Sequence, residues 1–356
     1  MSRHLSSLNR WCWLPLAIGL LAGCQEDSPL IPESPPPPPH DVQLQQLAYL
    51  SGAFPPFDLF QDYLYYLGPT DLVILDLGDP ANPDETGRLG FSPGAPNHLR
   101  ISGNRLFVQL AAPDSDFRIQ MFDLGNPADP VFLGEFPLDH SLSDLTVSGN
   151  TLYLTSNGNL VPVDITDPAD PVVGGSFPSA SYPAGLLAAT GDGLYVHESL
   201  VVAGGGNWGV PSYHSGLSSW SISEPMNPQH AAYRDSLPYM KSFESDGPLL
   251  IFNESSKLRV WNPTTSSNFR VGGMYQAWPG VIHGFDLAGG FAYLALGETG
   301  IQIVDLSDPV NLVGAGSHDR GSGAVDLAAS DTRLGSRNRL GDLEILDLSS
   351  PATPDF

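Results

Sequence analysis

The chain has 356 residues, 41% of them hydrophobic, and a formal net charge of −24. So acidic a surface argues against nucleic-acid binding and against adsorption to anionic lipid head groups. The 38 glycines and 34 prolines accompany enough apolar residues to form a core. The composition therefore indicates a turn-rich globular chain rather than a disordered one.

Residues 1–23 have the pattern of a secretory signal peptide. Arg3 and Arg10 precede an apolar run from Trp11 to Leu21, which is too short for a membrane-spanning helix. The run ends in Leu21-Ala22-Gly23-Cys24, which resembles the bacterial lipobox. This resemblance implies that Cys24 becomes the lipidated first residue of the mature protein. An ordinary signal peptide followed by a coincidental cysteine is the alternative.

The residues around Cys24 also bear on location and on redox chemistry. By resemblance to Gram-negative sorting rules, Gln25 at the second mature position implies the outer membrane of the cell envelope. The only other cysteine is Cys12, which would leave with the signal, so the mature domain has no thiol for a disulfide, a metal site or a nucleophile. Residues 24–41 contain the run Pro35 to Pro39, which predicts an extended tether between anchor and domain.

A short pattern recurs through the rest of the chain: a run of β-forming residues, an acid, and then a turn rich in proline. Recurrence at this spacing indicates a repeat architecture. The copies begin and end at Leu72 to Pro83, Ile119 to Pro130, Leu160 to Pro171, Leu217 to Pro225, Leu258 to Pro263, Ile301 to Pro309 and Leu343 to Pro351.

Each repeat unit contains four short strands separated by turn signals. In the second unit the expected strands are Asn97 to Ser102, Arg105 to Leu110, Arg118 to Leu124 and Val131 to Phe136, with the tight-turn pair Gly103-Asn104 after the first. The pattern has no helical periodicity, so residues 42–356 are predicted to form an all-β, seven-bladed β-propeller of four-stranded blades. Six or eight blades are the alternatives.

Closure of the ring can be predicted from the two ends of the domain. The last repeat reaches Phe356 without a fourth strand, and Val42 to Leu50 precedes the first complete unit without partners of its own. We therefore expect the N-terminal strand to complete the last blade, which would remove two free edges. The recurring acid after each third strand is interpreted as a turn residue, because Asp can accept a hydrogen bond from the backbone amide two residues on.

The repeat resembles the LVIVD repeat of bacterial and archaeal exported proteins, and the closest copy is Ile301 to Pro309. The resemblance implies a β-propeller of the cell surface or envelope, and it implies no chemistry. Three features depart from the pattern: Ser221 and Asn262 replace the acid in the fourth and fifth copies, and Arg333 to Asn338 replaces an apolar second strand in the seventh.

The longest insertion predicts where a binding site would lie. Ser199 to Gly216 joins the second and third strands of the fourth blade, on the side where each first strand begins, and long loops on rigid scaffolds are often functional. We call this side the insertion face and the other side the proline-turn face. The aromatic and histidine residues assigned to the insertion face are His98, His140, Tyr182, Trp208, Tyr213, His214, Tyr239, Trp278, His283 and His318.

Candidate ligand-binding residues are Trp208, Tyr213, His214, Trp278, His98 and His283, since Trp and Tyr offer flat apolar contact with a polar handle. The alternative is that the aromatic residues pack between blades and the histidines are ordinary surface residues. A metal held by His98, His140 and His283 has no support from spacing. No metal, cofactor or catalytic residue is predicted.

The commonest catalytic motifs are absent from the sequence. The Gly204 to Gly206 run lacks the lysine of a phosphate-binding loop, and the chain has no Gly-x-Ser-x-Gly or His-Glu-x-x-His pattern. The sequence therefore favours a non-enzymatic, lipid-anchored envelope scaffold that binds a glycan, a peptide or a protein through one loop face. An envelope enzyme with a His/Asp or metal site at the channel mouth, or a purely structural component, is the alternative.

Overall fold

The computed structural model describes residues 42–51, 56–92, 94–111, 117–179, 183–202, 212–237, 240–263, 271–319 and 323–352. The chain divides into two compact units, residues 1–34 and 35–356, and all described residues belong to the second. Regular structure in these residues consists of strands only. Within the same ranges, no helix has the length and apolar character needed to cross a membrane.

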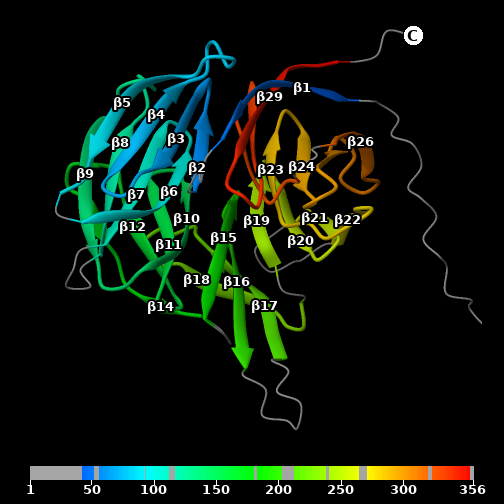
Figure 1. Ribbon diagram of the computed structural model, residues 1–356. Helices are drawn as coiled ribbons and strands as arrows, with labels where there is room; N and C mark the ends of the chain where they lie inside the picture. Colours follow the sequence, from blue (N-terminus) through cyan, green and yellow to red (C-terminus); the bar gives the residue numbers. More distant parts are fainter. Residues whose placement is uncertain are drawn as a thin grey trace, which may run out of the picture. The chain divides into compact units, whose positions relative to one another are not determined.

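The strands form seven antiparallel sheets, each built mainly from consecutive strands (Figure 1). The first blade contains β2 (Phe57–Phe60), β3 (Tyr63–Leu67), β4 (Asp71–Asp76) and β5 (Asp84–Gly90). The second contains β6 (Ala95–Ser102), β7 (Arg105–Ala111), β8 (Phe117–Asp123) and β9 (Val131–Leu138). The third contains β10 (Leu142–Ser148), β11 (Thr151–Ser156), β12 (Asn159–Asp164), β13 (Val172–Val173) and β14 (Phe177–Pro178).

The remaining blades repeat the same order. The fourth contains β15 (Ala184–Thr190), β16 (Gly193–Val202), β17 (Ser212–Ser221) and β18 (Gln229–Arg234). The fifth contains β19 (Met240–Asp246), β20 (Leu249–Glu254), β21 (Lys257–Trp261) and β22 (Val271–Gln276). The sixth contains β23 (Gly284–Ala288), β24 (Phe291–Ala295), β25 (Ile301–Asp305) and β26 (Val313–His318). The seventh contains β27 (Asp326–Ala329), β28 (Arg333–Arg337), β29 (Leu343–Ala352) and β1 (Gln43–Leu50).

The first strand of each blade is innermost. These seven strands contact one another in succession around the ring, and the last of them, β27, returns to β2. The predicted seven-bladed propeller is therefore confirmed.

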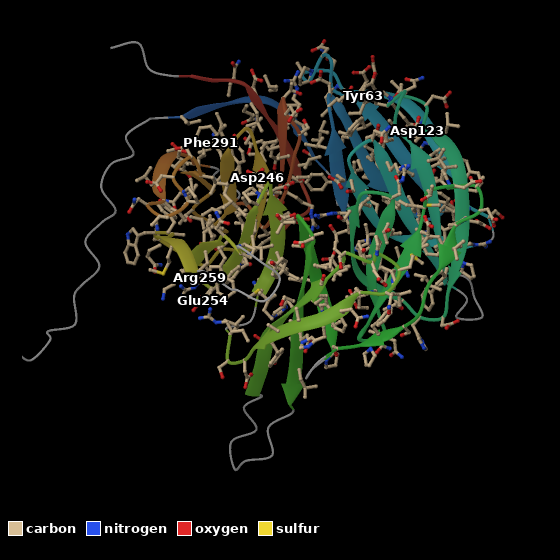
Figure 2. The ribbon with its side chains drawn as sticks, turned by 180° about the vertical axis from the view of Figure 1, so that it is seen from behind. Tyr63, Asp123, Asp246, Glu254, Arg259 and Phe291 are labelled. Atoms are coloured by element: carbon tan, nitrogen blue, oxygen red, sulfur yellow. The ribbon has the colours of Figure 1, made fainter. Side chains whose placement is uncertain are left out.

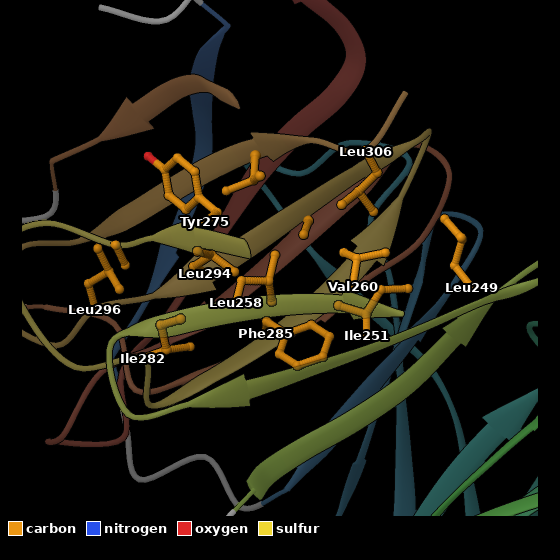
Figure 3. Packing of buried hydrophobic residues seen from close by; sticks show 13 residues of the cluster. Leu249, Ile251, Leu258, Val260, Tyr275, Ile282, Phe285, Leu294, Leu296 and Leu306 are labelled. Atoms are coloured by element: carbon orange, nitrogen blue, oxygen red, sulfur yellow. The ribbon is translucent and has the colours of Figure 1, made fainter. Parts of the chain in front are cut away.

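Apolar side chains between neighbouring blades hold the ring together. The structure has seven buried hydrophobic clusters, one at each interface between blades. Figure 3 shows the cluster between the fifth and sixth blades, where Ile251, Leu258 and Val260 pack against Phe285 and Leu294. Full burial of a side chain of this size contributes about 1.5–3 kcal/mol, so each interface rests mainly on hydrophobic burial.

The N-terminal strand closes the ring as predicted. β1 pairs antiparallel with β29, from Leu50 opposite Leu343 to Gln43 opposite Ala352, and the two ends of the domain lie side by side in Figure 1. The pairing is not only a matter of backbone hydrogen bonds. Ala48 of β1 is buried in the cluster between the seventh and first blades, so this strand joins the core.

The recurring acids are turn residues, which confirms their interpretation. After the third strand, the carboxylates of Asp76, Asp123, Asp164 and Asp305 each accept a hydrogen bond from the backbone N–H two residues on, at 2.7–3.2 Å. Gly103 has the left-handed φ of +59°, as expected for the tight turn between the first and second strands.

Two local expectations need correction, and one departure from the repeat pattern leaves the fold unchanged. In the third blade the repeat predicts one fourth strand from Val172 to Phe177, but Gly174 and Gly175 interrupt it and two short strands, β13 and β14, form instead. The seventh blade has a regular second strand, β28, despite its arginines. The insertion of the fourth blade is not all loop: β16 runs to Val202 and β17 starts at Ser212, so Leu200, Val201 and Val202 lengthen the hairpin.

The direction of the strands determines which segments lie on each of the two faces. Because first strands run from the insertion face to the proline-turn face, fourth strands run the opposite way, and β1 begins on the proline-turn side. In Figure 1 the extended β16–β17 hairpin and β1 lie at opposite ends of the domain. Figure 2 likewise shows Asp123 near the proline turns and Glu254 and Arg259 toward the insertion face.

We predict that an acid on the buried side of β1 opens the ring. Ala48→Glu would place an unpaired carboxylate in the apolar cluster and lower the free energy of unfolding by about 2 kcal/mol or more. Gln46→Glu, which changes the charge equally on the exposed side of the same strand, is the control. Urea unfolding measures both variants. Equal stability of the two would contradict the role given to β1.

Candidate functional site

Four charged residues occupy equivalent positions on the inner strands. Asp58, Arg100, Glu244 and Asp286 each lie opposite the third residue of the second strand of their blade. The corresponding residue of the seventh blade is the small Ala328. Charged side chains from four blades therefore line one level of the central channel.

One ion pair crosses the channel. Arg100 Nη2 on the second blade lies 2.6 Å from Glu244 Oε2 on the fifth blade, 144 residues away. Arg100 also interacts electrostatically with Asp58 and Asp144. One guanidinium thus faces several carboxylates, so the acids of the channel are not fully neutralised by it.

Asp58 and Asp286, together with Asp144 of the third blade, which also interacts with Arg100, connect neighbouring blades by a repeated arrangement. We call these three residues and Glu244 the channel acids. Asp58, Asp144 and Asp286 each accept the N–H of the next residue at 2.8–2.9 Å. The other oxygen of each accepts an N–H from the following blade, 43 residues further along the chain, at 2.7–2.8 Å. Each of these carboxylates therefore connects the inner strands of two neighbouring blades. The connected pairs are the first and second, the third and fourth, and the sixth and seventh blades.

The same enclosure changes the acidity of these groups. Burial, followed by the nearby charges of Glu244 and Asp58, raises the pKa of Asp286 to about 7. Burial raises the pKa of Asp144 to about 6 and also raises that of Asp58, although Arg100 opposes both shifts. Groups with such pKa values are common in functional sites and also occur in structural networks.

A cavity of about 330 Å³ opens beside this level of the channel. Its lining is mostly polar and includes Asp58, Arg100, Asp286, Ser330 and Asp331. Ser330 and Asp331 follow β27 at the turn into β28, so the cavity opens toward the proline-turn face. Among the described residues, no three His, Cys, Asp or Glu side chains are arranged to hold a metal ion.

The histidines of the insertion face are spread over several blades. His98 on β6 lies opposite Gln109, and burial followed by the charge of Arg100 lowers its pKa to about 4. His98 Nδ1 and the Nε2 of Gln109 are buried without a protein hydrogen-bond partner. His318 contacts Glu344 at 3.2 Å. Since no metal-binding group exists in the described part of the chain, His98, His140 and His283 do not form one.

Trp278 and His283 lie in the connection between β22 and β23. Trp278 is 54% exposed, and its carbonyl accepts a hydrogen bond from Gln302 at 3.4 Å. His283 is half-buried and donates its backbone N–H to the carbonyl of Ala295 at 2.8 Å. Burial, followed by the charges of Lys241 and Arg339, lowers the pKa of the His283 imidazole.

The other expected site residues are only partly covered by the structure. Trp208, Tyr182 and Tyr239 lie outside the described residues. The backbones of Tyr213 and His214 belong to β17, opposite Val201 and Leu200, and their side chains lie outside the described part. Of the six candidates, the structure therefore describes the side chains of Trp278, His283 and His98 only. His98 lies on the second blade, whereas Trp278 and His283 lie in the connection between the fifth and sixth blades.

The channel acids were missed by the sequence analysis. A signal for them existed, because Asp-Leu recurs in the first strands at Asp58, Asp144 and Asp286. An acid in the middle of an apolar strand is unusual and indicates a partner. Only the ring, however, brings Arg100 and Glu244 together from blades that are not neighbours.

Comparison with known proteins identifies the repeat. A family model described as LVIVD repeat matches residues 60–89, 141–178 and 283–319, which fall on the first, third and sixth blades. The chain thus carries LVIVD repeats, as its resemblance implied. Comparison with curated proteins gives no match.

Solved structures agree with the fold. The computationally designed Ika8 protein has a TM-score of 0.55 and 11% identity, covering 87% of this chain and 89% of that one. A chain of the Mitotic Checkpoint Complex has a TM-score of 0.57 and 11% identity, covering 96% of this chain and 100% of its own length. At this identity the likeness concerns the fold alone.

The channel acids predict an unusual dependence of stability on pH. The pKa of Asp286 is about 7 in the folded protein against 3.8 ordinarily, so the folded state binds more protons than the unfolded state between these values. The free energy of unfolding should therefore fall as pH rises from 5 to 8. Glu244, Asp58 and Arg100 are the charged groups that face this carboxylate.

Asp286→Asn should flatten this dependence, as measured by urea unfolding at several pH values. Asp308→Asn removes the same charge from an exposed proline turn and is the control, because the pKa of Asp308 is lowered by its hydrogen bonds. A slope that is unchanged by Asp286→Asn would contradict the titration of the channel.

Proposed function

We propose that this protein is a lipoprotein of the cell envelope whose propeller is a binding scaffold, with ligands recognised on the insertion face. The observation that carries the proposal is the opposition of the two faces: β1 begins on the proline-turn side, whereas the extended β16–β17 hairpin lies on the other (Figure 1). A tether formed by residues 24–41 would approach from the proline-turn side. Lipid on Cys24 would then leave the insertion face directed away from the outer membrane.

The charge of the proline-turn face supports this orientation. Carboxylates recur at its turns, among them Asp62, Asp76, Asp79, Asp123, Asp167, Asp192, Asp246, Asp308 and Asp331. Such a surface is repelled by anionic head groups over a Debye length of roughly 8–10 Å. The repulsion would keep the domain standing on its tether instead of lying on the bilayer.

The insertion face has features of a recognition surface. Trp278, Val281 and Leu340 are 54%, 43% and 78% exposed on short connections of the sixth and seventh blades. These connections are held by hydrogen bonds: Thr299 Oγ1 donates to the carbonyl of Pro279 at 3.0 Å, and the Leu340 N–H donates to Asn338 Oδ1 at 2.8 Å. Exposed apolar groups on a rigid frame lose little entropy on binding.

The proposed ligand-binding residues are Trp278, His283 and His98, together with Trp208, Tyr213 and His214 of the insertion. The partner would be a glycan, a peptide or another envelope protein. Nucleic acid does not suit the net charge of −24.

Two variants test the proposal in cells and in solution. Cys24→Ser should move the protein from the membrane fraction to the soluble fraction, because the acyl anchor is lost. Trp278→Ala should weaken binding to arrayed glycans or envelope fragments by about tenfold without lowering the melting temperature. Phe132→Ala, at a 52% exposed aromatic on β9, is the control. Membrane retention of Cys24→Ser, or full binding by Trp278→Ala, would contradict the proposal.

A second candidate function is acid–base catalysis in the channel. The observation that favours it is the cavity lined by Asp58 and Asp286, because a carboxyl group with a pKa of about 7 can exchange a proton at neutral pH. If it holds, a panel of hydrolase substrates should reveal turnover that Asp286→Asn abolishes and Asp308→Asn preserves. An absence of turnover in the unaltered protein would exclude this candidate.

A further inference from the structure

Three side chains that can carry positive charge converge on the insertion face from three successive blades. Lys241 lies in β19, His283 precedes β23, and Arg339 lies in the connection from β28 to β29. The last two approach Gly297: a Cβ atom at this glycine would be 2.9 Å from His283 Nε2 and 3.8 Å from Arg339 Nη2. Gly297 also has a left-handed φ of +64°, so a side chain at this position would obstruct the approach and strain the backbone.

Hydrogen bonds between the blades fix the backbones that carry these side chains. Asn253 Oδ1 accepts the N–H groups of Lys241 and Ser242 at 3.2 and 2.8 Å, while its Nδ2 donates to the carbonyl of Ile282 at 3.0 Å. Gly297 and Ala324 exchange two backbone hydrogen bonds at 2.7 and 2.8 Å. The fifth, sixth and seventh blades are thus joined at this point, and the charged side chains start from fixed positions.

The local charge differs from that of the rest of the protein. Lys241 and Arg339 are exposed, and their charges, after burial, lower the pKa of His283, which is thus a neutral hydrogen-bonding group at neutral pH. Of the neighbouring acids, Asp326 is paired with Arg337 at 2.8 Å, and Glu298 is exposed beside Gly297. Lys241 and Arg339 both act on His283, and this local positive charge in a chain of net charge −24 favours binding of an anionic group.

Trp278 adds a flat apolar contact on the same connection as His283. The Trp278 carbonyl accepts a hydrogen bond from the side chain of Gln302 on β25. The His283 N–H donates to the carbonyl of Ala295 on β24. Trp278 and His283 thus both belong to the β22–β23 connection, and each is bound to a strand of the sixth blade. An indole ring provides a flat apolar surface next to a polar environment. The indole ring and the cationic side chains therefore belong to one loop face, and a saccharide chain offers a flat ring to the first and a carboxylate to the others.

We propose that Trp278, Lys241, His283 and Arg339 form a binding site for a carboxylated saccharide, in which one sugar ring stacks on Trp278 and the carboxylate of a neighbouring sugar lies between Lys241 and Arg339. This inference rests on the proposed function and names its ligand class. A sugar acid holds its carboxylate one bond from a rigid ring. An acidic peptide carries it on a flexible side chain, whose ordering costs about 1–2 kcal/mol, so the saccharide is favoured.

The test compares the full chain binding to trigalacturonic acid, to its methyl ester and to tetraglutamate, by calorimetry. The acid should bind at least about tenfold more tightly than the ester, because charge-assisted hydrogen bonds are lost on esterification. Lys241→Gln combined with Arg339→Gln should weaken binding of the acid about 10- to 100-fold and leave the ester unchanged. Trp278→Ala should weaken both saccharides.

Arg105→Gln, at a cation on the proline-turn side, is the matched control and should bind like the unaltered protein. Equal affinity for acid and ester, or for the acid and tetraglutamate, would overturn the inference, as would full binding by the double variant. In those cases a loss of binding in Trp278→Ala would still support the proposed function. Binding of neither saccharide would overturn the inference, and the array and fractionation results would then decide the proposed function separately.

Discussion

The structure depends on burial of apolar side chains between neighbouring blades. A single four-stranded sheet of this kind has two apolar faces and cannot bury either of them alone. Stacking seven sheets in a ring gives each face a partner, and the seven clusters are the result. The ring is complete only when β1 joins β29, because otherwise the last blade would present a free edge and an incomplete core.

Closing the ring brings charged residues together that have no contact within a blade. Arg100 and Glu244 meet across the channel, and Asp58, Asp144 and Asp286 each connect one inner strand to the next. Hydrophobic burial holds neighbouring blades together without fixing their orientation. The hydrogen bonds of these carboxylates add a defined orientation between the inner strands. Burial raises the pKa values of these carboxyl groups, and the single Arg100 guanidinium only partly opposes that effect.

The two faces of the ring differ in how strongly their residues repeat from blade to blade. The proline-turn face contains the recurring acids, such as Asp123 and Asp308, because four of the blades turn there with the same Asp hydrogen bond. The insertion face varies from blade to blade, and it contains Trp278 and Arg339. Repetition is thus concentrated on one side and variation on the other, which is the arrangement expected when a fixed scaffold presents one adaptable surface.

The sequence by itself determined the repeat, the four-strand blades, the turn role of acids such as Asp76, and closure by the N-terminal strand. These properties arise from local periodicity and turn chemistry, which a single chain segment contains. Tertiary structure alone decided the pairing of Arg100 with Glu244, the hydrogen bonds of Asp286 to two blades, and the approach of His283 and Arg339 to Gly297. Those contacts join residues of different blades, and their distances depend on the curvature and closure of the whole ring. No spacing along the chain records that geometry.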